Sequence, residues 1–259
     1  MSEKVHPRAD DLDGLTALEF VKLMHAEETA AVATIKPQLV HVARAVEEIA
    51  GRLRRGGHMH YFGAGSSGLI AQLDAAECPG TFGAPPDMVQ AHAALDPEED
   101  DSALGAEAAT SSNLRPEDVV VGLSASGRTA YVLGAMEVAR ASGSLRVAVT
   151  SHPGSPVAQL ADIAIEVASG PEVIAGSTRL KAGTVQKLVL NMLSTAVFTR
   201  LGRTHRGRMV GVVASNEKLR ARAASIVADL AGISIEEARQ RLDASGGDVR
   251  AALNGSSGA

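Results

Sequence analysis

Four short apolar runs, each followed directly by a loop rich in small or polar residues, constrain the fold of this 259-residue chain most strongly. They span residues 58–62, 119–123, 145–149 and 162–167. Stretches with helical spacing separate the runs, and this alternation is typical of βαβ units. We therefore predict an α/β fold, a doubly wound parallel sheet with helices on both faces.

The two ends of the chain differ from this pattern. Residues 1–55 show helical spacing of apolar positions, and Thr16 is placed to cap the first helix. Near the other end, Ser234-Ile-Glu-Glu237 predicts a capping box that opens a small helical unit. We predict an N-terminal helical segment (1–55), a central ligand-binding domain (56–213) and a small C-terminal helical unit (214–259).

Composition narrows the classes of partner. The chain has 25 Lys and Arg against 30 Asp and Glu, and aromatic residues make up only 2%. A net charge of −5 and few aromatic rings argue against binding nucleic acid, which needs a basic face and stacking surfaces. The lone cysteine, Cys78, cannot form an internal disulfide, which fits a cytoplasmic protein. No apolar stretch is long enough to predict a membrane span, and we see no signal peptide.

The loops after the first three runs share one chemistry. They read Gly63-Ala-Gly-Ser-Ser-Gly68, Ser124-Ala-Ser-Gly-Arg-Thr129 and Thr150-Ser-His-Pro-Gly-Ser155. In open α/β sheets ligands bind at the carboxyl ends of the strands. Hydroxyls and backbone N–H groups at helix N-termini favour an anion there. Glycine and serine also make ordinary tight turns, but three such loops favour a phosphate or sugar-phosphate site.

Nucleotide binding fits the sequence less well. The first loop matches G-x-G-x-x-G, but a dinucleotide site also needs an acidic residue at the end of a second strand about 20 residues later. That region contains Pro79-Gly80 and Pro85-Pro86, and we predict no strand there. A Walker A loop, with its Gly-Lys-Ser/Thr, is missing from the sequence.

Three segments together resemble one family, the N-acetylmuramic acid 6-phosphate etherases, a branch of the sugar isomerase (SIS) domain proteins. They are the first glycine loop continued into Leu73-Asp-Ala-Ala-Glu-Cys-Pro79, the stretch 122–129, and the stretch 170–184. The resemblance runs from about residue 11 to the low 200s, and more weakly through 214–219. It implies an SIS-type fold. One departure is Leu69, where the family usually has arginine.

The resemblance also implies an activity. The family cleaves the lactyl ether of N-acetylmuramic acid 6-phosphate to give N-acetylglucosamine 6-phosphate and D-lactate, in the recycling of cell-wall amino sugars. The chemistry is elimination from the open-chain aldehyde followed by addition of water. It needs a base at C2 and an acid for the departing oxygen, and two carboxyl groups can supply both. No metal or organic cofactor is expected, because the aldehyde already acidifies C2.

The resemblance assigns the two carboxyl groups with different precision. The acid is the glutamate of the family's Glu-Cys-Pro motif, which is Glu77, and we expect it one turn beyond the first glycine loop. The base falls in the acidic run 96–101, where the match is partial. Glu99 is the first candidate and Glu98 the second. An acidic run that merely opens a helix is the competing interpretation.

The phosphate ligands follow from the second loop, which matches the SIS signature with its two serines and a threonine. Further ligands are expected in the first loop and on an opposite wall, which in SIS dimers can belong to the partner's site. The predicted ligands are Ser66, Ser67, Ser124, Ser126, Thr129, Ser177, Thr178 and Lys181. We also expect a homodimer, with the apolar helix from about 184 to 200 in its interface.

Two other functions stay open at this point. One is a sugar-phosphate-sensing regulator that resembles the glucokinase regulatory protein, and the other is an aldose–ketose phosphate isomerase. A metal pair at His58 and His60 is disfavoured because no third ligand has a diagnostic spacing. We interpret Cys78 as a small buried hydrophobic residue.

Overall fold

A five-stranded parallel sheet forms the centre of the protein in a computed structural model that describes residues 4–95, 97–212 and 217–254. The strands lie in the order β2-β1-β3-β4-β5. Their bounds are β1 Met59–Ala64, β2 Val89–Ala94, β3 Val119–Ser124, β4 Leu145–Thr150 and β5 Ile163–Glu166. This confirms the predicted α/β class and the four predicted strands, each to within two residues at either end.

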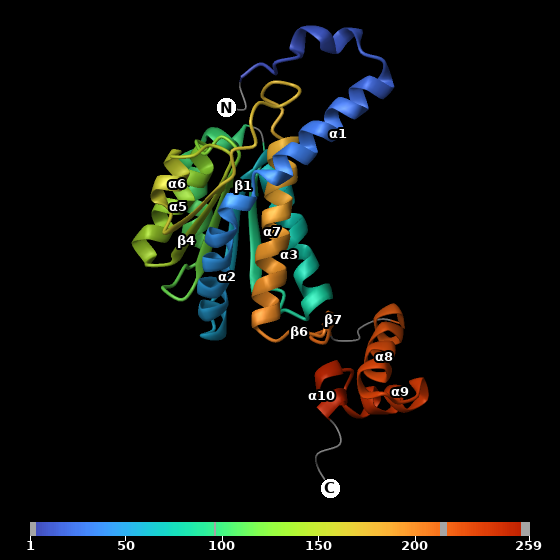
Figure 1. Cartoon of the computed structure of the whole chain (residues 1–259). Coiled ribbons are helices and arrows are strands. Elements are labelled where there is room, and N and C mark those ends of the chain that lie inside the picture. The colour runs from blue at the N-terminus through green and yellow to red at the C-terminus, as the bar shows by residue number, and fades with distance from the viewer. Residues whose placement is uncertain (1–3, 96, 213–216, 255–259) are drawn as a thin grey trace.

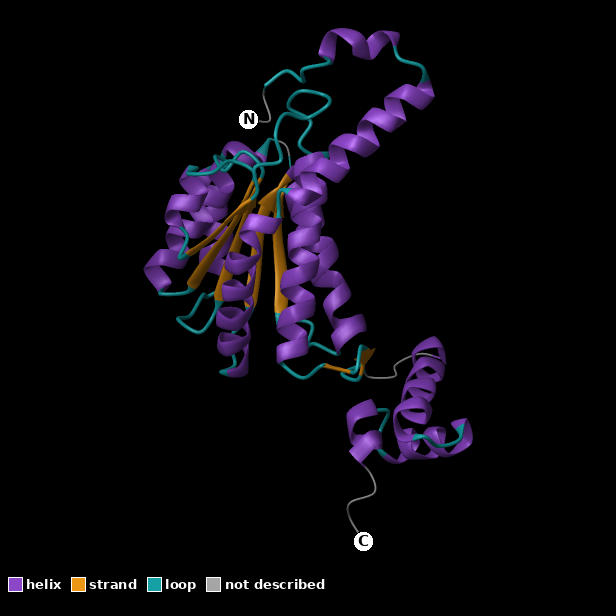
Figure 2. Ribbon diagram, viewed as in Figure 1, coloured by secondary structure: helices purple, strands orange, loops and turns teal. Residues whose placement is uncertain are grey.

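Helices cover both faces of the sheet (Figures 1 and 2). The helices of the central part are α1 Ala17–Ala33, α2 Leu39–Arg54, α3 Gly65–Phe82, α4 Ser102–Ser111, α5 Ala130–Ser142, α6 Pro156–Leu160 and α7 Lys181–Arg200. One apolar cluster joins α2, α3 and α7 to the sheet, and a second joins α5 and α6 to the other face. Short 3-10 turns lie at Ala9–Gly14, Lys36–Gln38 and Glu98–Asp100.

Helix α1 begins at the predicted cap. The Thr16 hydroxyl accepts a hydrogen bond from the Glu19 backbone N–H, and the Glu19 carboxylate accepts one from the Thr16 N–H at 2.8 Å. Beyond this cap the helix projects from the body of the protein in Figure 1 and leaves Leu18 and Val21 exposed.

Strand β2 corrects the sequence analysis, which predicted no strand before residue 119 other than 58–62. The segment reads Val-Gln-Ala-His-Ala-Ala, and alanine has a low preference for strands. Its pairing with β1, from Met59 opposite Val89 to Ala64 opposite Ala94, makes it an edge strand. The strand removes one argument raised against dinucleotide binding, that no second strand follows the first loop.

The helix α3 corrects a second expectation. It runs through Pro79 and ends only at Gly83, which adopts the left-handed conformation. Glu77 therefore lies 12 positions after Gly65, more than three turns along the helix and about 18 Å from its start, not one turn beyond the loop.

Helices α4 and α5 approach each other backbone to backbone. A Cβ at Gly105 would overlap the Tyr131 carbonyl, and a Cβ at Gly134 would overlap the Ser102 carbonyl. Glycine is therefore required at both contacts, and the two helices lie closer than any larger side chain would allow.

The C-terminal helices α8 Glu217–Ala231, α9 Ile235–Ala244 and α10 Val249–Asn254 enclose an apolar cluster of their own. At the start of α9 the Ser234 hydroxyl accepts a hydrogen bond from the Glu237 N–H, which is one half of the predicted capping box. A two-stranded hairpin, β6 Thr204–His205 and β7 Arg208–Met209, precedes this unit. The three-part division of the chain stays a prediction, and the first residues of the weaker resemblance at 214–219 lie outside the described residues.

None of the helices in the described residues is long and apolar enough to cross a membrane.

A buried histidine, His60, stacked on the half-buried His92, gives the fold a pH dependence. His60 Nδ1 lies 3.2 Å from His92 Nε2, and the two rings stack. Burial, with a contribution from His92, lowers the pKa of His60 from 6.5 to about 4. The unfolded chain therefore takes up a proton near pH 6.5 that the folded chain takes up only near pH 4, so this contribution to stability is complete above pH 6.5.

We expect the free energy of unfolding to fall by up to about 3 kcal/mol through this group as the pH decreases from 6.5 to 4. Urea unfolding at pH 7.5 and pH 5 measures the difference. His60→Gln, which cannot titrate, should show a smaller difference, whereas the exposed His25→Gln should behave like the parent. An equal pH dependence for His60→Gln and the parent would contradict the assignment.

Candidate functional site

The loop from Ser124 to Thr129 follows β3 and leads into α5. The Ser124 hydroxyl lies 2.8 Å from the Thr129 hydroxyl and accepts a hydrogen bond from the Gly127 N–H at 2.9 Å. The Ser126 hydroxyl accepts one from the Arg128 N–H at 3.2 Å. The loop therefore gathers three hydroxyl groups beside the N-terminus of α5, where the first backbone N–H groups have no partner within the helix.

Glycine at position 127 is a requirement of this loop. Its φ is +66°, and a Cβ there would overlap the Ser155 side chain in the loop after β4. The Ser151 N–H also donates to the Ala125 carbonyl at 3.1 Å. The loops after β3 and β4 are therefore packed against each other.

The first glycine loop, residues 63–68, lies beside the loop of residues 124–129. These loops follow β1 and β3, which pair directly. At Gly63 a Cβ would lie 2.9 Å from the Gly68 nitrogen, so the strand and the helix after it need glycine for their close approach. Ser67 is buried and donates to Gln186 Oε1 of α7 at 2.9 Å, whereas Ser66 is half-buried.

The acidic run after β2 separates the two candidate bases. Glu98 accepts a hydrogen bond from the Leu95 N–H at 3.2 Å and so closes its own turn. The Glu99 carboxylate points toward the first glycine loop, since a Cβ at Gly65 would lie 4.0 Å from its Oε2. Asp101 caps α4 by accepting hydrogen bonds from the Ala103 and Leu104 N–H groups. The residue at position 96 lies outside the described residues.

Glu77 is not near these loops within one chain. Its side chain is 59% exposed and lies 3.4 Å from Lys187 Nζ. Leu69 and Leu73 precede it by two turns and one turn on the same face of α3, and both are exposed. The structure therefore brings Glu99 to the glycine loop but leaves Glu77 about three turns away, on an exposed face with two apolar side chains.

The predicted opposite wall is part of a buried charge cluster. Lys181 is 4% exposed, and its Nζ lies 2.6 Å from Glu27 of α1. This hydrogen bond lowers the pKa of Glu27. Glu172, fully buried, accepts hydrogen bonds from the Lys181 and Ala182 N–H groups at the start of α7. Ser177 and Thr178 lie half-buried in the loop before α7.

Sequence reasoning missed two polar groups at this edge of the sheet. The Ser151 hydroxyl and the Gln186 Nε2 amide are buried and have no hydrogen-bond partner among the described residues. Both residues stand in stretches that the sequence singled out, but only their spatial surroundings mark them. A buried polar group without a partner is costly, so both are candidates to bind a ligand.

The structure also bears on metal binding and on the role of Cys78. Among the described residues, no group of three or more His, Cys, Asp or Glu side chains is placed to hold a metal ion. Cys78 is buried, and burial raises the pKa of its thiol to about 12, so it stays a thiol at neutral pH.

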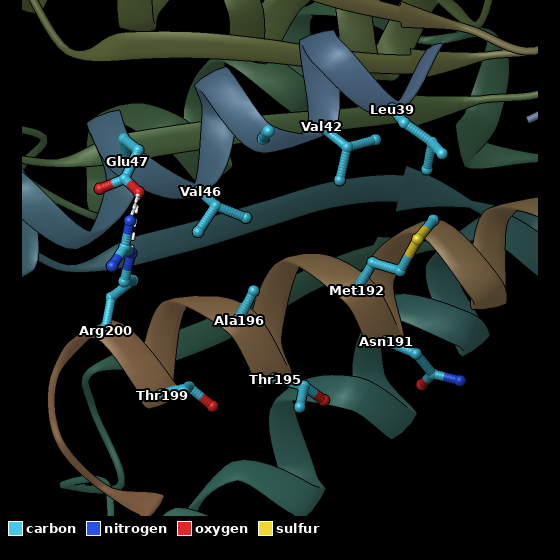
Figure 3. Close-up of a pocket in the computed structure, with 11 residues that line it drawn as sticks. Leu39, Val42, Val46, Glu47, Asn191, Met192, Thr195, Ala196, Thr199 and Arg200 are labelled. Carbon is cyan, nitrogen blue, oxygen red and sulfur yellow. Dashed lines mark hydrogen bonds and ion pairs between the residues drawn. The ribbon is translucent and has the colours of Figure 1, made fainter. Parts of the chain in front are cut away.

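A separate groove of about 740 Å³ lies between α2 and α7 (Figure 3). It is lined mainly by apolar side chains such as Val42, Val46 and Met192 and carries none of the predicted site residues.

Comparison with known proteins identifies similar chains. The family model described as SIS domain matches residues 101–196. A protein of Jannaschia sp. named N-acetylmuramic acid 6-phosphate etherase is 44% identical over 262 residues, covering 98% of this chain and 83% of its own. One of the same name from Symbiobacterium thermophilum is 46% identical, covering 94% and 84%.

Solved structures resemble the fold alone. A phosphoheptose isomerase from Neisseria gonorrhoeae superimposes with a TM-score of 0.54 at 23% identity, covering 71% of this chain and all of its own. A phosphoheptose isomerase from Francisella tularensis gives a TM-score of 0.55 at 20% identity, with the same coverage. These similarities confirm the predicted SIS-type fold.

The crowding at Gly127 can be tested against a matched glycine. Gly127 and Gly154 both have positive φ, but a Cβ at Gly154 would meet no atom within 4 Å. We expect Gly154→Ala to cost about 1–2 kcal/mol of unfolding free energy, from backbone strain alone. Gly127→Ala should cost more, because the loops after β3 and β4 must also separate. Equal losses in chemical unfolding would show that the two loops are not locked together.

Proposed function

Because the chain belongs to the N-acetylmuramic acid 6-phosphate etherase family, we propose that it cleaves the lactyl ether of N-acetylmuramic acid 6-phosphate. The products are N-acetylglucosamine 6-phosphate and D-lactate, so the protein is a carbon–oxygen lyase that acts in the cytoplasm on a phosphorylated amino sugar. The observation that carries this proposal is identity of 41–46% to eight such etherases over nearly the whole chain. The isomerase and regulator alternatives are not favoured, because the relatives that match nearly the whole chain are named etherases, whereas the solved isomerases are similar in fold alone.

The 124–129 loop supports the phosphate part of the proposal. Ser124, Ser126 and Thr129 offer hydroxyl groups, and the start of α5 offers backbone N–H groups. Hydrogen bonds from neutral donors to a charged phosphate are stronger than those between neutral groups. We assign the phosphate of the substrate to this loop, with Ser66 and Ser67 of the neighbouring loop toward the sugar.

The reaction needs two proton transfers at adjacent carbons. Glu99 takes the proton from C2 of the open-chain aldehyde, the electron pair forms the C2–C3 double bond, and the C3–O bond breaks. Glu77 gives its proton to the departing lactate oxygen. Water then adds to C3 while Glu77 takes back a proton and Glu99 returns one to C2, so both carboxyl groups end as they began.

The distance between the two glutamates within one chain supports a site built from two copies of the chain. Glu99 lies beside Gly65, but Glu77 lies about 18 Å along α3 from Gly65 within the same chain. Two groups that act on adjacent carbons cannot be so far apart. We propose a homodimer in which Glu77 of one protomer meets Glu99 of the other. The exposed Leu69 and Leu73 beside Glu77 suit such a covered face.

Substituting Glu77 and substituting Glu99 should block different steps of the reaction. We expect Glu77→Gln to stop lactate release but to keep exchange of solvent deuterium into C2, because deprotonation needs only the aldehyde and a base. Glu99→Gln should lose both, each by about 10²–10⁴-fold. Glu98→Gln tests whether the base is instead the neighbouring glutamate. If it abolishes exchange while Glu99→Gln does not, the base is Glu98.

Mixing these variants tests the shared site. Neither Glu77→Gln nor Glu99→Gln homodimers should release lactate. After subunit exchange, half of the dimers are mixed, and each mixed dimer has one site with both glutamates intact. Activity should therefore return to about a quarter of the parent value. No recovery, with exchange confirmed by mass spectrometry, would place both glutamates in one chain's own site.

A further inference from the structure

Helices α3 and α7 lie side by side (Figure 1). Two carboxyl groups of α3 lie within 4.0 Å of the ammonium group of one α7 lysine. Lys187 Nζ lies 3.4 Å from Glu77 Oε2 and 4.0 Å from Asp74 Oδ1. Asp74 and Glu77 are three positions apart, so they are neighbours on the helix surface. The sequence analysis gave neither Asp74 nor Lys187 a role.

Asp74 is held rigidly. It is 3% exposed and accepts hydrogen bonds from the Tyr61 hydroxyl of β1 at 2.9 Å and from the Ser194 hydroxyl of α7 at 3.0 Å. Burial raises the pKa of its carboxyl, and the two hydrogen bonds act in the opposite direction. Asp74 therefore joins a strand and two helices at one buried point.

Lys187 differs from a surface lysine because its ammonium group lies between a fixed carboxyl and a more exposed one. Its side chain is 28% exposed, whereas that of Glu77 is 59% exposed. An ammonium at this distance favours the ionised form of a carboxyl, and a second carboxyl on the other side weakens that effect.

We propose that Lys187 is a positioning residue for the Glu77 carboxyl, and that Asp74 holds the Lys187 ammonium in place. This inference rests on the proposed etherase activity. When Glu77 gives its proton to the lactate oxygen, it becomes a carboxylate next to an ammonium group that is already in position. The same ammonium orients that carboxylate to take a proton from the water that adds at C3.

Few other titratable groups face this cluster in the described part of the chain. On α3 there is the Cys78 thiol, whose hydrogen bond goes to the Asp74 carbonyl, and on β1 there is the Tyr61 hydroxyl. Burial raises the pKa of both groups, so both stay neutral near pH 7. Within one protomer, the charge beside Glu77 therefore depends on Lys187 and Asp74. In the proposed homodimer, Glu99 of the other protomer adds a carboxyl group to the same site, and this group is unchanged in every variant compared below.

The test is the pH profile of lactate release. Removing the positive charge with Lys187→Met should move the alkaline fall of the profile to higher pH. Asp74→Asn, which removes the negative charge, should move it down. Lys187→Arg should restore the parent profile, and the exposed Lys36→Met, an equal change of charge elsewhere, should not move it. A purely structural role would lower the rate at every pH without moving the profile.

Asp74→Asn changes a buried group and could impair folding, so a second variant separates the loss of charge from the loss of a buried hydrogen bond. Tyr61→Phe removes one hydrogen bond to Asp74 but no charge, and its profile should stay in place even if its rate falls. The pH dependence of deuterium exchange at C2 should be the same in Lys187→Met and in the parent, because that step needs only Glu99. A shift in the exchange profile would overturn the assignment of Lys187 to Glu77.

A direct titration separates this inference from the activity it rests on. In protein labelled with ¹³C at the glutamate carboxyls, the Glu77 signal is the one lost in Glu77→Gln. Its titration midpoint should move to higher pH in Lys187→Met, whether or not the protein releases lactate. An unmoved midpoint overturns the role of Lys187. A moved midpoint without lactate release overturns the etherase proposal instead.

Discussion

Strands β1 and β3 lie side by side in the sheet, yet the chain leaves them in opposite directions. After β1 it crosses to β2 at one edge, and after β3 it adds β4 and β5 toward the other. The connections that leave these two strands therefore run toward opposite edges of the sheet. In doubly wound sheets ligands bind at such a point. The glycine and serine loops of this protein follow those two strands, so the order of the strands decides where a charged ligand can be held.

Much of the fold could be predicted from local pattern. The four predicted strands are β-branched or aromatic runs bounded by small residues, and Thr16 and Ser234 cap helices as their sequences indicate. Strand β2 could not be predicted, because an alanine-rich segment becomes a strand only through pairing with β1. The prolines of the region 79–86 argue against a strand there, and Pro79 in fact lies inside α3, which ends at Phe82.

The candidate site was less predictable than the fold, because its groups depend on contacts between distant segments. Local sequence shows the hydroxyls of the 124–129 loop, since they share one turn. It does not show that Lys181 is buried against Glu27, which lies 154 positions earlier, or that Ser67 meets Gln186. The positions of Glu77 and Glu99 depend on how far along each element the residue falls. That distance needs the true element boundaries, which are the least certain part of any sequence interpretation.

The backbone contact between α4 and α5 has a consequence for how this protein can evolve. Helix α4 follows the turn that carries Glu99, and α5 follows the loop that carries Ser126, so the contact at Gly105 and Gly134 sets the spacing between the turn and the loop. The distance between the turn and the loop is therefore fixed by contacts between main-chain atoms and not by the size of any side chain. A descendant that acts on a longer or shorter phosphorylated molecule could not arise by exchanging side chains along these helices. It would need insertions or deletions in the loops, while the two glycines stay.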